Sequence, residues 1–130
     1  MTIHASALLA ARPGPLREGL RALMSTIPQI AIVREAHDVP SMLDMVSAQH
    51  PALVLLDADL ANGGEWPTLK RIKSGWPQVR CLVLADDSQQ QQAASAACAD
   101  VVVLKGCPAT KLVEIIERLL PKRERPVQPA

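Results

Sequence analysis

Charged side chains stand at the ends of apolar runs, and these are the residues that could do chemistry. Asp57 follows the run that ends at Leu56, and Asp59 lies two positions further on. Lys105 follows the run from 101 to 104. If both runs are parallel strands, their carboxyl ends meet at one edge of a sheet, where an Asp and a Lys would form a charge pair at a shared site. The alternative interpretation of Asp57 is that it only caps the following turn.

Other catalytic and metal-binding patterns are missing from the sequence. The loops that follow the apolar runs contain no Ser/His/Asp, Cys/His or paired-carboxylate constellation, so we do not expect an enzyme. Cys81, Cys98 and Cys107 are odd in number and show no CxxC or Cys/His spacing. We expect these thiols to be reduced and mostly buried.

Composition favours one domain of ordinary size. The chain has 130 residues, of which 48% are hydrophobic and 21% charged, and this is enough for one core. A net charge of +1 gives no reason to expect nucleic acid or a membrane surface as a partner. No apolar run approaches the roughly 20 residues of a membrane span, and the amino terminus lacks a signal-peptide pattern. We expect a cytoplasmic protein with one domain over 1–120 and a flexible, Pro-rich tail over 121–130.

Short apolar runs alternate with amphipathic segments, which indicates strand-helix units on a parallel sheet. Continuous apolarity predicts strands that are buried on both faces. The expected architecture is a three-layer, doubly wound α/β domain with the flavodoxin-like strand order 2-1-3-4-5, an order taken from known folds of this kind. The five predicted strands are Ala5–Ala10, Ile30–Arg34, Ala52–Leu56, Arg80–Ala85 and Val101–Leu104.

Helical spacing of apolar residues predicts the segments between the strands. Asp38 is expected to cap the helix over 39–46, and Asp86 and Asp87 are expected to cap the helix over 89–98. That helix offers only Ala and Cys to a core, so we expect it to pack thinly. The segment over 66–74 and the stretch from 108 to 119 are also predicted helices. The first helix is expected to bury Leu16, Leu20, Leu23 and Ile27.

The chain resembles the receiver domains of bacterial two-component response regulators from about residue 8 to residue 120. By this resemblance, Asp57 takes the role of the phosphoacceptor and Lys105 that of the cation that binds the phosphoryl oxygens. The first helix resembles that of receivers that precede a DNA-binding helix-turn-helix, a class that regulates transcription. The segments that carry the likeness are Leu16–Leu23, Val54–Asp57 and Val103–Lys105.

The resemblance breaks down at the metal site. Receivers place two acidic residues after the first strand to hold Mg²⁺, and alignment on the first helix puts Ala11 and Arg12 there. Because an Ala and a cation remove two oxygen ligands, Mg²⁺ held by Asp57 and Asp59 is expected to bind weakly, and no other cofactor is expected. Phosphoryl transfer relies on that ion, so we do not expect catalysed autophosphorylation. We expect Arg12 to reach toward Asp57 as a fixed partner, with solvent as the alternative.

The residues that transmit phosphorylation in receivers are also replaced. The family carries a Ser or Thr at the end of strand four and an aromatic residue on strand five, where this chain has Ala85 and Val102. The chain contains no Tyr or Phe, so the usual switch cannot operate. In the loop after Asp57, Ala61 and Glu65 stand where the family tends to have Pro and Gly.

Three functions are compatible with these residues. The first is an atypical receiver, or pseudo-receiver, that acts in signal transduction through protein contacts with little or no Mg²⁺-dependent phosphorylation. The second is a receiver that accepts phosphate on Asp57 from a histidine kinase. The third is a flavodoxin-like cofactor binder, which is disfavoured because two of the residues in 11–15 are prolines that lack the N–H groups needed to cradle phosphate. Expected partners are a histidine kinase, another receiver, an output domain or a second copy of the chain, without membrane or direct nucleic-acid contact.

Overall fold

Strands and helices alternate along residues 5–120, which are the residues described by the computed structural model. The predicted tail over 121–130 lies outside them. In chain order the elements are β1 (Ala5–Ala10), α1 (Pro15–Met24), β2 (Ile30–Ala36), α2 (Val39–Gln49), β3 (Leu53–Asp57), α3 (Glu65–Gly75), β4 (Arg80–Ala85), α4 (Ser88–Ala96), β5 (Val101–Leu104) and α5 (Ala109–Leu119).

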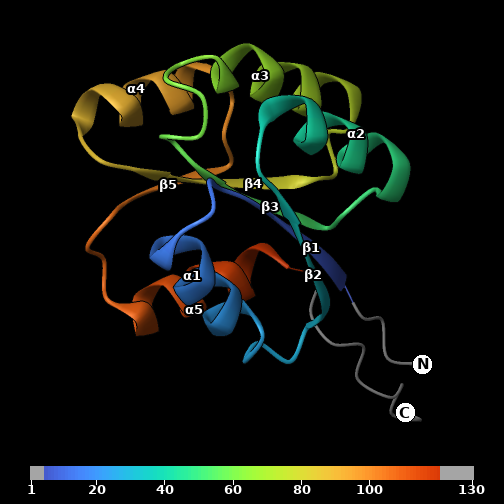
Figure 1. Ribbon diagram of the computed structural model, residues 1–130, viewed down its shortest axis with the longest axis vertical. Coiled ribbons are helices and arrows are strands. Elements are labelled where there is room, and N and C mark those ends of the chain that lie inside the picture. Colours follow the sequence, from blue (N-terminus) through green and yellow to red (C-terminus); the bar gives the residue numbers. More distant parts are fainter. Residues whose placement is uncertain (1–4, 121–130) are drawn as a thin grey trace, which may run out of the picture.

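The five strands form one parallel sheet in the order β2-β1-β3-β4-β5. Helices α1 and α5 cover one face of the sheet, and α2, α3 and α4 cover the other (Figure 1). The predicted three-layer, doubly wound fold and its strand order are therefore confirmed. From β1 the chain adds β2 on one side, and then returns to add β3, β4 and β5 on the other side. The strand order therefore switches between β1 and β3, and the loops after these two strands flank the crevice that such a switch creates.

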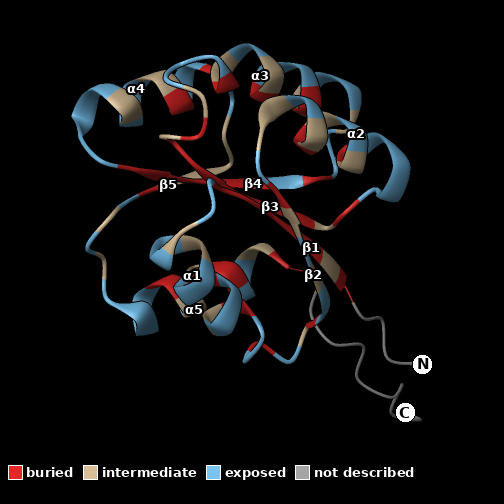
Figure 2. Cartoon of the chain, in the orientation of Figure 1, coloured by how far each residue is buried: buried red, intermediate tan, exposed pale blue. Residues whose placement is uncertain are grey.

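Burial differs between the middle and the edges of the sheet. All five residues of β3 are buried, and β1 and β4 are buried along most of their length (Figure 2). Edge strand β2 has three exposed residues, and edge strand β5 has one exposed and two half-buried residues, so the prediction of strands buried on both faces is wrong for these two. An edge strand has a neighbour on one side only, and the helix layers cover its faces incompletely.

Two hydrophobic clusters, one on each side of the sheet, hold the layers together. Successive strand residues point to opposite faces, so Leu8 packs in one cluster and Leu9 in the other. Leu55 and Leu56 divide in the same way along β3. Strand β3 is thus packed on both faces, which fixes the position of the Asp57 carboxylate at its end.

Helix α1 buries a different set of residues from the predicted one. It ends at Met24, which is fully buried with Leu20, whereas Leu16 is 42% exposed. Ile27 is buried from the loop beyond the helix. The predicted buried face is therefore only partly formed by α1, because Ile27 lies beyond the residue where the helix ends.

The remaining helices form over the predicted segments, with ends that differ by up to three residues. Asp38 caps α2 by accepting a hydrogen bond from the Ser41 N–H at 2.8 Å, as predicted. Helix α3 spans the predicted segment with one more residue at each end. Ala94 is the one buried residue of α4, which confirms thin packing of this helix. None of the helices in 5–120 is long and apolar enough to cross a membrane.

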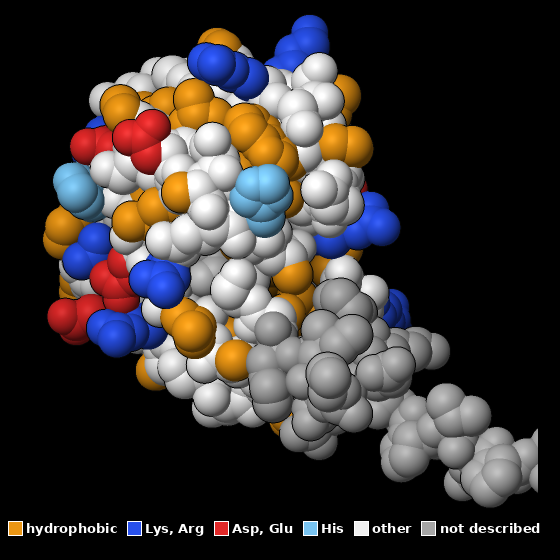
Figure 3. All heavy atoms as spheres, turned by 90° about the vertical axis from the view of Figure 1, so that its right-hand side faces the viewer, with side chains coloured by type: hydrophobic (Ala, Val, Ile, Leu, Met, Phe, Trp, Pro, Cys, Tyr) orange, Lys and Arg blue, Asp and Glu red, His pale blue; other side chains and the backbone are white. Residues whose placement is uncertain are grey.

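Surface chemistry is mixed on the side of the molecule that carries α2. Lys and Arg side chains lie there among Asp and Glu side chains, and the hydrophobic groups form small separate spots (Figure 3).

The cysteines were expected to be mostly buried, but only Cys81 is buried. Burial raises the pKa of its thiol to about 12. Cys98 is exposed and Cys107 half-buried, because both lie in turns that follow an element and not within the sheet.

Candidate functional site

Asp57 and Lys105 meet at the carboxyl edge of the sheet. Asp57 is the last residue of β3 and is 7% exposed. Lys105 follows β5, and its backbone N–H donates to the Ala85 carbonyl at 2.8 Å, which continues the pairing with β4. The Lys105 Nζ atom lies 2.6 Å from Asp57 Oδ1. The ends of two strands therefore bring together the charge pair that the sequence predicts.

Two further carboxylates bind the same ammonium group. Lys105 Nζ lies 2.9 Å from Asp59 Oδ2 and 2.9 Å from Asp86 Oδ1. The contact with Asp59 is a hydrogen bond, and the contacts with Asp57 and Asp86 are ion pairs. We call Lys105, Asp57, Asp59 and Asp86 the lysine cluster. The ammonium group is therefore surrounded by three carboxylates.

Asp86 has a different role from the predicted one. Both Asp86 and Asp87 were expected to cap α4, but it is Asp87 Oδ1 that accepts the Gln90 N–H, at 2.9 Å. A helix has one residue at its N-cap position, so the preceding Asp86 is left free to turn toward Lys105. The cap prediction is right for Asp87 and wrong for Asp86.

Mutual hydrogen bonds shift the ionisation of the cluster. Asp86, then Lys105 and Gln90, hold the pKa of the Asp59 carboxyl well below its ordinary value. Burial alone would lower the pKa of Lys105, but bonds to Asp57, Asp59 and Asp86 outweigh it and raise that pKa above its ordinary value. Lys105 therefore stays charged throughout the physiological pH range.

Hydrogen bonds also tie the cluster to the backbone and to α4. Asp57 Oδ1 accepts the Asp59 N–H at 3.1 Å, so Asp57 supports the turn after β3 as well as pairing with Lys105. The Gln90 side chain donates from Nε2 to Asp59 Oδ1 at 3.0 Å and accepts the Asp86 N–H at 2.6 Å. A side chain of α4 thus bridges the two loops that carry the outer carboxylates.

Ala11 and Arg12 lie in the loop after β1, and neither adds an oxygen atom to the cluster. Ala11 is 1% exposed and packs in the core. Arg12 Nε donates to the Leu60 carbonyl at 3.1 Å. Among the ion pairs of residues 5–120, none joins Arg12 to Asp57. The expected Arg12–Asp57 partnership is therefore not formed, because Lys105 occupies Asp57 and the Leu60 carbonyl binds the guanidinium.

The chain's donor set fits a divalent ion poorly. Within the described range, no group of three or more His, Cys, Asp and Glu side chains is placed to hold a metal. The oxygens of Asp57 and Asp59 that face the crevice are bound by Lys105. Mg²⁺ needs several oxygen ligands in near-octahedral geometry, and an ammonium at that point would repel it.

Ala85 and Val102, which stand at the positions of the receiver switch, lie in apolar surroundings. Ala85 is fully buried at the end of β4. Val102 is half-buried in β5 and packs against the cluster that contains Ala94 of α4. Neither side chain offers a polar atom that could contact the lysine cluster.

Sequence reasoning noted Glu65 only as a departure from the family pattern and missed its environment. The side chain is 0% exposed at the start of α3. Its Oε2 accepts the Gly63 N–H at 3.0 Å, and its Oε1 has no hydrogen-bond partner. Burial raises the pKa of this carboxyl, more than the surrounding backbone N–H groups lower it. The one signal in the sequence was an acid at a position where receivers tend to have Gly.

The doubly wound sheet of order 2-1-3-4-5, with an Asp–Lys pair at its carboxyl edge, is the arrangement that the resemblance to receivers implies. The comparisons with solved structures support this class. A LuxR-family two-component response regulator from Aurantimonas is 26% identical, with a TM-score of 0.79 over 89% of this chain and 84% of that one.

Two other solved structures share the fold at lower identity. The receiver domain of NtrX from Brucella abortus is 22% identical, with a TM-score of 0.77 over 88% of this chain and 98% of that one. A putative response regulator from Chloroflexus aurantiacus is 17% identical, with a TM-score of 0.78 over 89% and 97%. No family model and no curated protein matches the sequence. The resemblance to response regulator receivers is confirmed, and these are signalling proteins.

Proposed function

We propose that this chain is an atypical receiver domain that transmits signals through protein contacts and is not controlled by Mg²⁺-dependent phosphorylation of Asp57. The observation that carries the proposal is the occupancy of Lys105. Its ammonium binds Asp57, Asp59 and Asp86 at 2.6, 2.9 and 2.9 Å. A phosphoryl group on Asp57 would have to displace these acceptors before Lys105 could bind its oxygens.

The loop after β1 supports the same proposal. Mg²⁺ neutralises the charge that develops when a phosphoryl group is transferred to a carboxylate. Ala11 supplies no ligand, and Arg12 adds a positive charge and bonds to the Leu60 carbonyl. The fixed ammonium of Lys105 then takes the place of a metal ion as the positive charge of the site. Such a site holds one conformation without an ion.

The expected partners are proteins of two-component signalling: a histidine kinase, another receiver, an output domain or a second copy of the chain. Leu16 and Leu104 are large hydrophobic residues exposed by 42% and 45%. Both line a shallow, mostly apolar pocket of about 110 Å³ that Lys105 also borders. Apolar surface beside a charged cluster suits a contact whose formation depends on the conformation of that cluster.

The test is an NMR titration of backbone amides with MgCl₂, followed by beryllofluoride as a mimic of the phosphoryl group. In the wild type we expect no saturable shift at Asp57 or Lys105 up to roughly 10 mM Mg²⁺, since the oxygen ligands are missing. The same series on Asp57→Asn, with Asp44→Asn as the matched control, identifies any response that depends on the acceptor. Asp44 is exposed on α2, away from the cluster.

A positive arm uses Arg12→Asp, which restores one acid after β1. This variant should gain a Mg²⁺ response at Asp57, whereas Arg34→Asp, on the exposed edge strand β2, should not. Beryllofluoride shifts in the wild type that disappear in Asp57→Asn and persist in Asp44→Asn would overturn the proposal.

Beryllofluoride shifts that depend on Asp57 would establish the alternative, a receiver that accepts phosphate on Asp57. One observation favours this alternative. The Asp57 carboxylate lies at the carboxyl edge of the sheet with the Lys105 ammonium 2.6 Å away, and this is the residue pair to which the resemblance to receivers gives the phosphoacceptor and phosphoryl-binding roles. The two functions therefore make opposite predictions for a single titration.

A further inference from the structure

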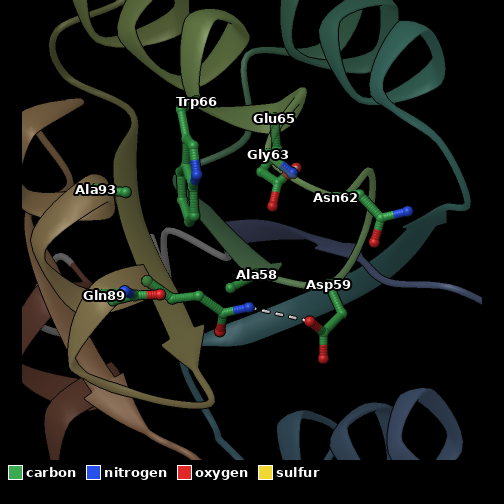
Figure 4. Close-up of a pocket in the computed structure, with 9 residues that line it drawn as sticks. Ala58, Asp59, Asn62, Gly63, Glu65, Trp66, Gln89 and Ala93 are labelled. Carbon is green, nitrogen blue, oxygen red and sulfur yellow. Dashed lines mark hydrogen bonds between the residues drawn. The ribbon is translucent and has the colours of Figure 1, made fainter.

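A pocket of about 320 Å³ opens between the start of α3 and the exposed side of α4, next to the lysine cluster. In the close-up, Trp66 and Glu65 approach from the α3 side, while Asp59 and Gln89 approach from the opposite side (Figure 4). This volume is near the lower end for ligand sites and suits a small molecule or one extended side chain. The lining residues are Ala58, Asp59, Asn62, Gly63, Glu65, Trp66, Gln89, Gln90 and Ala93.

The wall of this pocket contains a carboxyl group with an unmet hydrogen bond. Glu65 is fully buried, and its Oε1 is the one buried side-chain oxygen or nitrogen in 5–120 that has no partner. Buried carboxylate oxygens are nearly always hydrogen-bonded, because leaving one bare is unfavourable. The other oxygen already accepts the Gly63 N–H at 3.0 Å. What Oε1 lacks is a donor, and a donor that carries positive charge would bind it most strongly.

The rest of the lining favours an organic cation over a metal ion. The charged residues of the lining, Asp59 and Glu65, are both acidic. Trp66 supplies an indole ring, which attracts cations over its face, and Ala58 and Ala93 supply apolar surface for a short alkyl chain. Mg²⁺ would gain nothing from such apolar walls and needs more oxygen ligands than they leave.

We propose that this pocket, which we call the Glu65 pocket, binds a primary alkylammonium group, with the ammonium at Glu65 Oε1 and the alkyl chain against Trp66 and Ala93. The ligand is a free small amine or the side chain of a lysine in a partner protein, since both present the same group. This site is separate from the Asp57–Lys105 pair and goes beyond the proposed signalling function. It shares Asp59 with the lysine cluster and is also lined by Gln90, which bonds to Asp59, so its occupant would touch the residues that tie α4 to that cluster.

The experiment titrates the full chain with butylammonium chloride at constant ionic strength and follows the Gly63 amide and the Trp66 indole N–H by NMR. Saturable shifts are expected, with a Kd of roughly millimolar order for so small a ligand. Butanol has the same chain without the charge and should produce none. Nα-acetyl-lysine methylamide is a second probe, and tighter binding of this compound would identify a protein side chain as the source.

Three variants make the test specific. Glu65→Gln should weaken butylammonium binding roughly tenfold or more, because it removes the charged acceptor. Glu18→Gln, an exposed acid on α1, is the matched control and should leave binding unchanged. Ala93→Leu places a larger apolar side chain in the lining and leaves Glu65 unchanged, so it should also weaken binding, and the proposal is tested even if Glu65→Gln folds poorly.

Equal shifts with butanol, unchanged binding in both Glu65→Gln and Ala93→Leu, or shifts at Gly63 with MgCl₂ and none with the amine would each overturn the proposal. Because none of these readouts involves Asp57, their failure is distinguishable from failure of the proposed receiver function.

Discussion

Lys105 is the residue on which the charges of the site converge, and replacing it by Met should destabilise the fold. Three carboxylates would then face one another without a cation, and Asp57 is nearly buried. Removing one partner of a buried pair costs several kcal/mol, but Asp59 and Asp86 are 47% and 41% exposed, so solvent screens part of the repulsion. We expect a loss of about 1–3 kcal/mol at pH 7, measured by urea unfolding.

The matched control is Lys111→Met. Lys111 is exposed on α5 and pairs with Glu114 at 3.9 Å, so its removal should change the unfolding free energy by less than about 0.5 kcal/mol. Equal losses in the two variants would show that the lysine cluster contributes nothing beyond a surface ion pair.

Residue roles were predictable where the end of a strand decides them and unpredictable where the local backbone conformation or the burial of a single polar side chain does. Asp57 and Lys105 each follow a buried strand, so the parallel sheet alone brings them together. Asp86 and Asp87 are neighbours of the same type, and only the backbone conformation at the N-cap selects Asp87 for the cap. Glu65 has no apolar pattern that predicts burial, because glutamate at the start of a helix is usually exposed.

At the scale of elements, α4 depends on Gln90 more than on packing. Ala94 is its one buried residue, while the Gln90 side chain bonds to Asp59 and to the Asp86 N–H. Gln90→Ala should therefore speed amide hydrogen exchange in α4 roughly threefold to tenfold, with less than about 1 kcal/mol lost in global stability. Gln92→Ala, at an exposed position on the same helix, is the control. Exchange rates that rise equally in both variants would indicate a change in helix propensity and no bridge.

The order of the elements followed from the sequence, but their exact ends and edges did not. Continuous apolar runs located the five strands because the middle of a parallel sheet is covered on both faces. The same rule failed for β2 and β5, since periodicity cannot tell which strands lie at the edges. For α1, the apolar repeat continued to Ile27, although the helix ends at Met24, because a loop residue can fill the core as well as a helical one.

For the whole molecule, the shifted carboxyl groups give opposite slopes of stability with pH. The folded-state pKa of Asp59 is lowered from 3.8, so its contribution is present above that value and is lost as pH falls toward the folded pKa. The folded-state pKa of Glu65 is raised from 4.5, so folding favours its neutral form. Stability therefore declines as pH rises from 4.5 through the folded pKa of Glu65.

Urea unfolding of the wild type, Asp59→Asn and Glu65→Gln at a series of pH values separates the two effects. Relative to the wild type, Asp59→Asn should be least stable above pH 3.8, and the difference should shrink in more acidic solution as the native carboxylate is protonated. The stability of Glu65→Gln relative to the wild type should increase as pH rises above 4.5, because the variant has no carboxyl group to ionise in a buried site. Asp44→Asn, at an exposed position of α2, should run parallel to the wild type throughout. If the unfolding free energy of Glu65→Gln instead follows that of the wild type at every pH, burial does not disfavour the ionised Glu65 carboxylate in solution. The Oε1 atom on which the Glu65 pocket depends would then already have a hydrogen-bond donor within the chain.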